Sequence, residues 1–251
     1  MFEQMSILDF MYPTVSINKP VRLIELFAGY GSQAMALERL GVDFETYKVV
    51  EFDKYAIASY NAVHGTDFPT INICDVKGID LDITDRERFT YLLTYSFPCT
   101  DISVAGQMKG FAEGTGTRSS LLWEVKRILL ELKELGTLPD VLVMENVTAI
   151  HSQDNTPHFQ KWLNFLEEQG YSSYVADLNA SDYGVAQNRD RTFVVSILGD
   201  YNYKFPTPID LDKCIEDYFE DLSDEQALQL IVKSQKAKDL LVELDEENKL
   251  Q

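Results

Sequence analysis

The feature that most constrains the fold is a short apolar stretch, residues 21–26, followed by a glycine-containing loop, residues 27–32 (FAGYGS). A helical pattern fills residues 33–40, and Gly41 stands where a helix-ending glycine belongs. Strand-like and helical stretches continue to alternate along the chain. This alternation predicts an α/β fold with a mostly parallel sheet and helices on both faces.

The glycine loop predicts a cofactor site. Gly29 and Gly31 let the backbone approach a ligand closely, and the helix that follows presents its N-terminal amides. The next strand-like stretch, residues 46–50, is followed by Glu51, about 20 residues after Gly31, where a carboxylate hydrogen-bonds ribose hydroxyls. Two glycines alone are often only a tight turn, and it is Glu51 that favours a nucleoside-containing cofactor.

A cysteine follows another apolar stretch, residues 91–95, within the segment 96–106 (SFPCTDISVAG). Pro98 immediately precedes Cys99, and a proline fixes the local backbone and removes one donor. Because loops after parallel strands hold the chemistry of open α/β folds, Cys99 is a candidate nucleophile. A small buried structural cysteine is the usual alternative, but other segments supply the groups that a nucleophile would need.

Two later segments bring charged side chains to strand ends. A strand-like stretch precedes Glu145, and another follows residues 187–191 (QNRDR). Alternation along a strand places Arg189 and Arg191 on the same side, so both would be able to hold one ligand. The ordinary alternative is a surface carboxylate and two solvated charges on an edge strand.

These segments, in this order, resemble the motifs of the cytosine-5 DNA methyltransferase family over roughly residues 20–208. Residues 27–31 resemble its F-x-G-x-G cofactor loop, and residues 51–53 (EFD) resemble the acidic segment that follows. Residues 145–147 (ENV) and 187–191 match its E-N-V and Q-x-R-x-R motifs. Its nucleophile loop is matched by Pro98, Cys99, Ser103, Ala105 and Gly106, whereas Ser96 and Thr100 replace a usual glycine and a usual glutamine.

The resemblance implies a Rossmann-like methyltransferase fold that uses S-adenosyl-L-methionine. Phe52 would stack on the adenine, unless it is a core residue. Residues 74–76 (CDV) stand where the family has an aspartate that contacts adenine, so Asp75 would lie near the adenine amino group. The predicted cofactor-binding residues are Phe27, Gly29, Gly31, Glu51, Phe52, Asp75 and Pro98.

The resemblance also implies a covalent mechanism. Because C5 of cytosine is a poor nucleophile, a Cys99 thiolate would add to C6 and make C5 electron-rich. Glu145 would protonate or hydrogen-bond the ring at N3, and Arg191 with Arg189 would stabilise charge at O2. The target base must leave the duplex, and the glycine-rich residues 106–118 would close over it as a lid, unless they are an ordinary surface loop. The predicted catalytic residues are Cys99, Glu145, Arg189 and Arg191.

Three parts are predicted along the chain: an N-terminal extension (residues 1–20), the catalytic and cofactor-binding domain (21–208) and a helical, acidic tail (209–251). Single-chain members of the family continue into a target-recognition domain and a final cofactor-side helix. About sixty residues follow Arg191, so the target-recognition domain is expected to be absent. The chain resembles the larger, catalytic half of a two-chain member.

The net charge of the chain also favours the interpretation as one half of a two-chain enzyme. The 41 acidic and 22 basic residues give a net charge of −19, a poor surface for the phosphates of double-stranded DNA. A second, more basic chain with the target-recognition domain and the final cofactor-side motif would supply the contacts with the phosphates. The alternative is that the basic side chains of this chain gather in one cleft. Two other functions stay open: a stand-alone RNA or DNA cytosine methyltransferase, and a catalytically inactive cofactor-binding module, which the intact catalytic residues disfavour.

Location and metal content follow from what the sequence lacks. Three cysteines fit a reducing cytosol better than a disulfide framework. No apolar run approaches about 20 residues and no signal peptide is visible, so a cytoplasmic protein without a membrane span is expected. His64, His151 and His158 lack the spacing of metal ligands, and no metal site is predicted.

Overall fold

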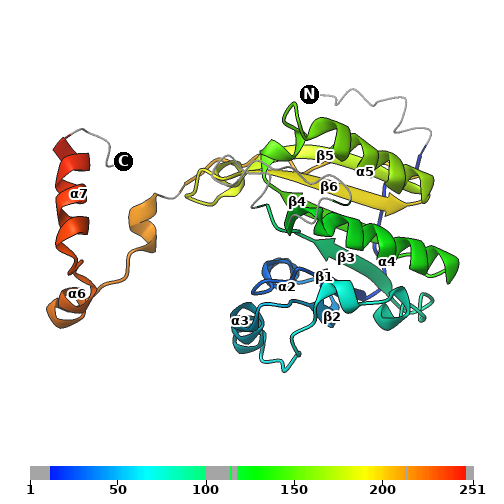
Figure 1. Cartoon of the computed structure of the whole chain (residues 1–251), viewed down its shortest axis with the longest axis horizontal. Coiled ribbons are helices and arrows are strands. Elements are labelled where there is room, and N and C mark those ends of the chain that lie inside the picture. The colour runs from blue at the N-terminus through cyan, green and yellow to red at the C-terminus, as the bar shows by residue number, and fades with distance from the viewer. Residues whose placement is uncertain (1–11, 100–113, 115–117, 213, 247–251) are drawn as a thin grey trace. The chain divides into compact units, whose positions relative to one another are not determined.

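The computed structural model describes residues 12–99, 114, 118–212 and 214–246, and the chain divides into two compact units, Met1–Asp210 and Leu211–Gln251. A six-stranded sheet with the strand order β2-β1-β3-β4-β6-β5 is the centre of the first unit (Figure 1). Its strands are β1 (Val21–Leu26), β2 (Phe44–Val50), β3 (Thr90–Tyr95), β4 (Val141–Asn146), β5 (Tyr171–Asn179) and β6 (Asp190–Leu198).

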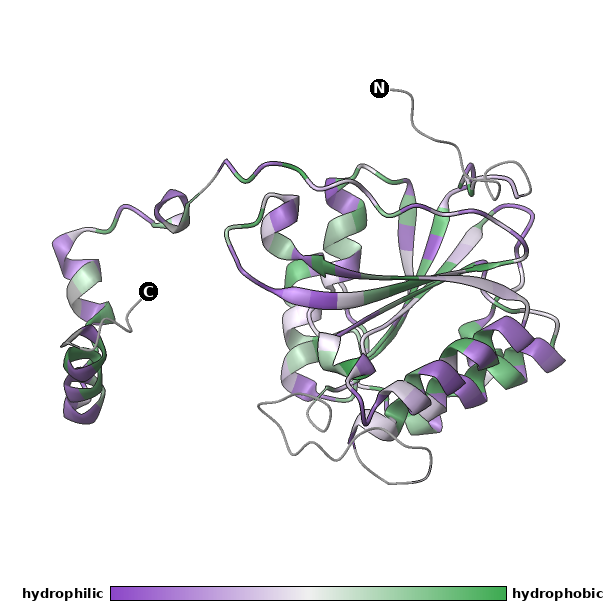
Figure 2. Ribbon diagram, turned by 90° about the horizontal axis from the view of Figure 1, so that it is seen from above, coloured by the Kyte–Doolittle hydropathy of each residue, from purple (hydrophilic) through white to green (hydrophobic). Residues whose placement is uncertain are grey.

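The sheet is mostly parallel, with helices on both faces. Strands β2, β1, β3 and β4 run in one direction, whereas β6 is antiparallel to β4 and to β5. The helices of this unit are α2 (Ser32–Arg39), α3 (Lys54–His64), α4 (Leu122–Glu134) and α5 (Thr156–Glu168). Because β1 and β3 lead to β2 and β4 in opposite directions along the sheet, right-handed crossovers place α2 and α4 on opposite faces. Figure 2 shows helices on both sides of the sheet. The predicted α/β class is confirmed.

Local sequence explains where the helices begin and what they bury. Helix α3 begins at Asp53, whose carboxylate accepts hydrogen bonds from the amides of Tyr55 (2.7 Å) and Ala56 (3.1 Å). In α4, apolar residues three and four positions apart form one buried face against the sheet. This face consists of Leu122, Trp123, Val125, Ile128, Leu129 and Leu132.

The carboxyl ends of the four parallel strands meet at one edge of the sheet, here called the carboxyl edge. Leu26 pairs with both Val50 and Tyr95, the last residues of β2 and β3. Strand β6 runs the other way, and Thr192 near its beginning pairs with Asn146 at the end of β4. The loops after four strands and the beginning of β6 therefore lie at the same edge.

After β6 the chain returns along the sheet from the opposite edge. Asn202 forms an isolated bridge with Thr14. The Ile209 amide then donates to the Asp182 carbonyl at 2.8 Å, in the connection between β5 and β6. Since β5 ends and β6 begins at the carboxyl edge, residues 199–209 carry the chain back to that edge.

The second unit contains the 3-10 helix η6 (Ile215–Tyr218) and the helices α6 (Asp224–Leu230) and α7 (Gln235–Glu246). Helix α6 begins at a capping box, in which the Ser223 amide donates to the Gln226 side-chain oxygen at 3.0 Å. Several large apolar side chains of this unit are exposed, including Leu230, Ile231, Val232, Leu240, Leu241 and Val242. Within the described ranges of both units, every helix is too short or too polar to cross a membrane.

Candidate active site

The loop after β1 has an unusual backbone. Phe27 has φ of 58° and Gly29 has φ of 58°, both in the left-handed region. For a side chain such as that of Phe27 this conformation costs about 1–3 kcal/mol, so the surrounding structure must impose it. The Ala28 amide donates to the Val50 carbonyl at 3.2 Å, and the Gly29 amide donates to Glu51 Oε2 at 3.0 Å. The loop after β2 thus holds the loop after β1.

Glu51 is the residue that joins these two loops. Its side chain is buried, and its other oxygen, Oε1, accepts from the Asp53 amide at 2.8 Å. Each carboxylate oxygen has two lone pairs, so Glu51 keeps acceptor capacity on both oxygens beyond these two bonds. That capacity is what a ribose diol would use.

Gly31 serves a packing role that the sequence did not reveal. It has φ of 84°, and a Cβ added there would lie 2.6 Å from Tyr60 Cε2 and would also run into the His64 ring. By contrast, a Cβ added at Gly29 would meet nothing within 4 Å. Gly31 therefore makes room for α3, whereas at Gly29 only the backbone conformation favours glycine.

A cavity of about 340 Å³ opens at the carboxyl edge beside these loops. Of the predicted cofactor residues, Phe27, Glu51, Phe52 and Pro98 line it. Phe52 is 65% exposed, so it is not a core residue. The remaining lining residues are Val50, Ile71, Asn72, Ile73, Cys74, Ser96 and Leu121.

Asp75 is placed differently from the other predicted cofactor residues. It is exposed and does not line the cavity, although its neighbours in the 3-10 helix η1 (Ile73–Asp75) do. Asn72 caps η1, because its side-chain oxygen accepts from the Cys74 amide at 3.1 Å, and it also lines the cavity. Asparagine is a common capping residue, but this preference alone does not indicate that Asn72 lines a cavity.

The segment before Cys99 is held from three directions. Gln33 of α2 donates to the Ser96 hydroxyl at 3.3 Å, and Asn146 of β4 donates to the Phe97 carbonyl at 3.0 Å. The Ser119 hydroxyl donates to the Pro98 carbonyl at 2.6 Å. Cys99 itself is partly exposed and is a free thiol. Thr100, Ser103, Ala105, Gly106 and the predicted lid 106–118, apart from Gly114 and Arg118, lie outside the described residues.

The acidic and basic candidates meet at the same edge. Arg191 Nε lies 3.0 Å from Glu145 Oε1, and Arg189 Nη2 lies 4.0 Å from the same oxygen. The prediction that both arginines point to one side of the strand is therefore confirmed. The side chains of Glu145 and Arg191 are 25% and 22% exposed, and that of Arg189 is 48% exposed, so a ligand can reach all three.

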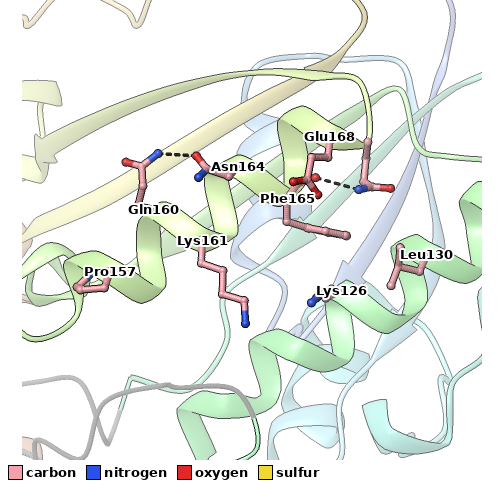
Figure 3. Close-up of a pocket in the computed structure, with 9 residues that line it drawn as sticks. Lys126, Leu130, Pro157, Gln160, Lys161, Asn164, Phe165 and Glu168 are labelled. Carbon is pink, nitrogen blue, oxygen red and sulfur yellow. Dashed lines mark hydrogen bonds between the residues drawn. The ribbon is translucent and has the colours of Figure 1, made fainter.

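A second cavity, of about 560 Å³, lies between α4 and α5 and contains none of the predicted site residues (Figure 3). Lys126 and Lys161 line it, and both ammonium groups lie over the Trp123 ring, at 5.4 Å and 5.1 Å from its centroid. Among the described residues, no cluster of three or more His, Cys, Asp or Glu side chains is arranged to hold a metal ion.

Comparison with known proteins identifies relatives of the chain. A family model described as C-5 cytosine-specific DNA methylase matches residues 21–251. The Type II methyltransferase M2.ScrFI of Lactococcus lactis subsp. cremoris is 31% identical over 80% of this chain and 68% of its own length. The Type II methyltransferase M.HhaI of Haemophilus parahaemolyticus is 34% identical over 84% of this chain and 60% of its own length.

Solved structures have the same fold. The Entamoeba histolytica methyltransferase EhMeth matches 83% of this chain with a TM-score of 0.64 and 19% identity, and the match covers 62% of its length. The S. pombe Dnmt2 methyltransferase matches 83% of this chain with a TM-score of 0.55 and 19% identity, over 57% of its length. The chain thus spans between about half and two thirds of the length of these relatives.

Proposed function

The chain belongs to the C-5 cytosine-specific DNA methylase family, and from this premise we propose that it transfers a methyl group from S-adenosyl-L-methionine to C5 of cytosine in double-stranded DNA. The observation that carries the proposal is the meeting of Glu145 with Arg189 and Arg191 at the carboxyl edge, where the Cys99 loop also lies. A carboxyl group beside two guanidinium groups complements the N3 and O2 edge of a cytosine.

The residues that line the cavity at the carboxyl edge match the chemical groups of the proposed cofactor. Phe27 and Phe52 offer aromatic rings to a flat base, and Glu51 offers acceptors to ribose hydroxyls. Because Asp75 does not line the cavity, we assign the polar contact with the adenine edge to Asn72. When bound, S-adenosyl-L-methionine would supply a methyl group on a positively charged sulfur.

The catalytic residues have separate roles in the proposed reaction. The Cys99 thiolate forms a bond to C6 of a flipped cytosine, and the electrons of the C5–C6 double bond make C5 nucleophilic. Glu145 gives a proton or a hydrogen bond to N3, while Arg191 and Arg189 stabilise charge at O2. C5 takes the methyl group, which leaves S-adenosylhomocysteine as a product. The C5 proton then passes to water, the N3 proton returns to Glu145, the bond from Cys99 to C6 breaks, and the aromatic ring is restored.

We propose that a second protein chain supplies much of the affinity for DNA. The net charge of −19 opposes contact with phosphates, and Arg22, Arg86 and Arg127 are each engaged in ion pairs with carboxylates. A more basic segment with a target-recognition role, on a second chain, would supply the missing contacts. The two-chain arrangement stays a prediction.

Transfer of a labelled methyl group tests the proposal. The chain is incubated with labelled S-adenosyl-L-methionine and mixed-sequence duplex DNA, alone and with the product of its neighbouring gene, and with RNA as the alternative substrate. Cys99→Ser is expected to lower transfer at least about a thousandfold while cofactor binding persists. Cys214→Ser, at an exposed free cysteine of the second unit, is the matched control and should leave transfer unchanged. Full transfer by Cys99→Ser would exclude the covalent mechanism.

A further inference from the structure

Arg127 of α4 binds the segment that forms one wall of the cofactor cavity. Its Nη2 donates to the carbonyls of Ile73 (3.2 Å) and Val76 (2.8 Å). Its Nε and Nη1 each lie 2.8 Å from a carboxylate oxygen, of Glu124 and Glu131 respectively. Each nitrogen of this guanidinium therefore has at least one partner, and the two glutamates fix its orientation toward the backbone carbonyls.

Glu131 holds the same segment at a second point. Its Oε2 accepts from the Gly78 amide at 2.6 Å, while Oε1 binds Arg127. The Gly78 amide, and to a smaller extent the Arg127 guanidinium, lower the pKa of Glu131, so the carboxylate is charged in this contact. Space is tight here, because a Cβ added at Gly78 would lie 2.9 Å from Glu131 Cβ.

The wall needs this support because it belongs to no strand or long helix. Between β2 and β3, the part of the chain that faces the cavity is the three-residue helix η1 with its cap, Asn72. On its other side it is joined to the sheet through the Ile71 amide, which donates to the Glu51 carbonyl at 2.8 Å. Arg127 and Glu131 thus hold the wall from α4, and Glu51 holds it from the end of β2.

We propose that Arg127, together with Glu131, is a positioning residue for the methyl donor: it sets the distance between the Asn72–Cys74 wall and the aromatic residues Phe27 and Phe52. The inference rests on the proposed function, because the ligand is S-adenosyl-L-methionine. Arg127 does not line the cavity and acts through the backbone of residues 73–78.

Arg86 provides a matched control at the opposite edge of the sheet. Its guanidinium also donates to a backbone carbonyl, that of Leu138, and pairs with a carboxylate, Asp140. Asp140 in turn accepts from the Tyr91 amide at 2.8 Å, at the beginning of β3. The side chains of Arg86 and Arg127 are 32% and 34% exposed, so Arg86 tests whether removal of a similarly exposed guanidinium far from the cavity also weakens binding.

The test compares Arg127→Met, Arg127→Lys and Arg86→Met in the full chain. Calorimetric titration with S-adenosylhomocysteine gives the dissociation constant, and thermal unfolding gives Tm. Arg127→Met is expected to weaken binding about tenfold, and Arg127→Lys, which keeps one donor group near the carbonyls, about threefold. Arg86→Met should also lower Tm but leave binding within about twofold.

The outcomes separate the inference from the proposed function. Equal binding by Arg127→Met and the wild type, with lowered Tm, would reduce Arg127 to a structural residue and overturn the inference. A wild-type chain that does not bind S-adenosylhomocysteine, either alone or with the product of its neighbouring gene, would instead contradict the proposed function. If Arg127→Met does not fold, Glu131→Gln removes the charged partner at Oε1, and about threefold weaker binding without loss of folding would support the same role.

Discussion

Glu51 and Glu145 both stand at the carboxyl edge of the sheet, yet their surroundings differ. Glu51 is buried and accepts from two backbone amides, those of Gly29 and Asp53. Glu145 is partly exposed, and within the described part of the chain its carboxylate lies beside the guanidinium groups of Arg189 and Arg191. The first carboxylate organises the backbone around a cavity, and the second is available to a ligand. Substitutions should therefore affect stability and binding at Glu51, but the reaction rate at Glu145.

Among the substitutions that test this contrast, the largest effect is expected at Glu145. Glu145→Gln keeps the shape of the side chain but cannot deliver a proton to N3, so kcat should fall about 10²- to 10³-fold. The dissociation constant of the methyl donor and Tm should remain unchanged. Single-turnover methyl transfer and calorimetry measure these quantities. If Glu145→Gln lowered the affinity for the methyl donor as much as it lowered kcat, Glu145 would not differ from Glu51 in the way proposed here.

The two arginines should differ from each other in the same assay. Arg191 lies 3.0 Å from Glu145, whereas Arg189 lies at 4.0 Å and is more exposed. Arg191→Ala should lower kcat about 100-fold, and Arg189→Ala about tenfold. Equal losses would mean that the two guanidinium groups contact the target base equally in the complex with DNA, despite their different distances here.

Glu51 is expected to give the smaller but broader effect. Glu51→Ala leaves the amides of Gly29 and Asp53 without their acceptor, which should lower the free energy of unfolding by about 1–3 kcal/mol. The same change should weaken cofactor binding about tenfold, through the lost ribose contact and the relaxed loop. Urea unfolding and calorimetry test both. Weaker binding at full stability would show that Glu51 contacts the ligand but does not hold the loops.

The smallest effect is expected from Glu25, which is fully buried in β1 and accepts a hydrogen bond from the Tyr60 hydroxyl. Burial raises the pKa of Glu25, against the opposing effect of that hydrogen bond. The folded protein therefore binds the proton of the Glu25 carboxyl group more tightly than the unfolded chain does, in which this group has a pKa of about 4.3. Protonated Glu25 therefore contributes fully to the free energy of unfolding below that pH. This contribution is lost as the pH rises through the pKa that Glu25 has in the folded protein.

Glu25→Gln, which cannot ionise, makes this pH dependence measurable. Relative to the wild type, the variant should gain free energy of unfolding between pH 4 and pH 8, as followed by urea unfolding. A constant difference between the two proteins across this range would mean that Glu25 titrates alike in the folded and unfolded states.

The sequence predicted best the elements with local signals. The alternating pattern predicted β1, β2, β3, β4 and β6, and the spacing within residues 187–191 placed Arg189 and Arg191 on one side. Strand β5 was not identified: Tyr171 is buried at its beginning, but most of its other residues are only partly buried or exposed. Its place is fixed by antiparallel pairing with β6, the next strand along the chain.

Residues that act through tertiary contacts had no local signal. Gly31 was predicted to bind the cofactor, and its close approach to the Tyr60 ring on α3 is a second role that the sequence did not indicate. Asp75 was assigned to the adenine contact, yet Asn72 lines the cavity, because the cap of η1 decides which side chain faces it. The contacts of Arg127 join residues more than 50 positions apart, and no spacing within one helix predicts them.

The return of residues 199–209 along the sheet has a consequence for protein engineering. Strand β6 delivers the chain to the edge far from Cys99, but the hydrogen bond between Ile209 and Asp182 brings it back beside the beginning of β6. A heterologous DNA-reading module fused after Asp210, in place of residues 211–251, would start at the edge that carries Glu145 and Arg191. Because the backbone returns to this edge, a short linker would be enough to join the methyltransferase domain to the module. The module would then select which genomic sites are methylated.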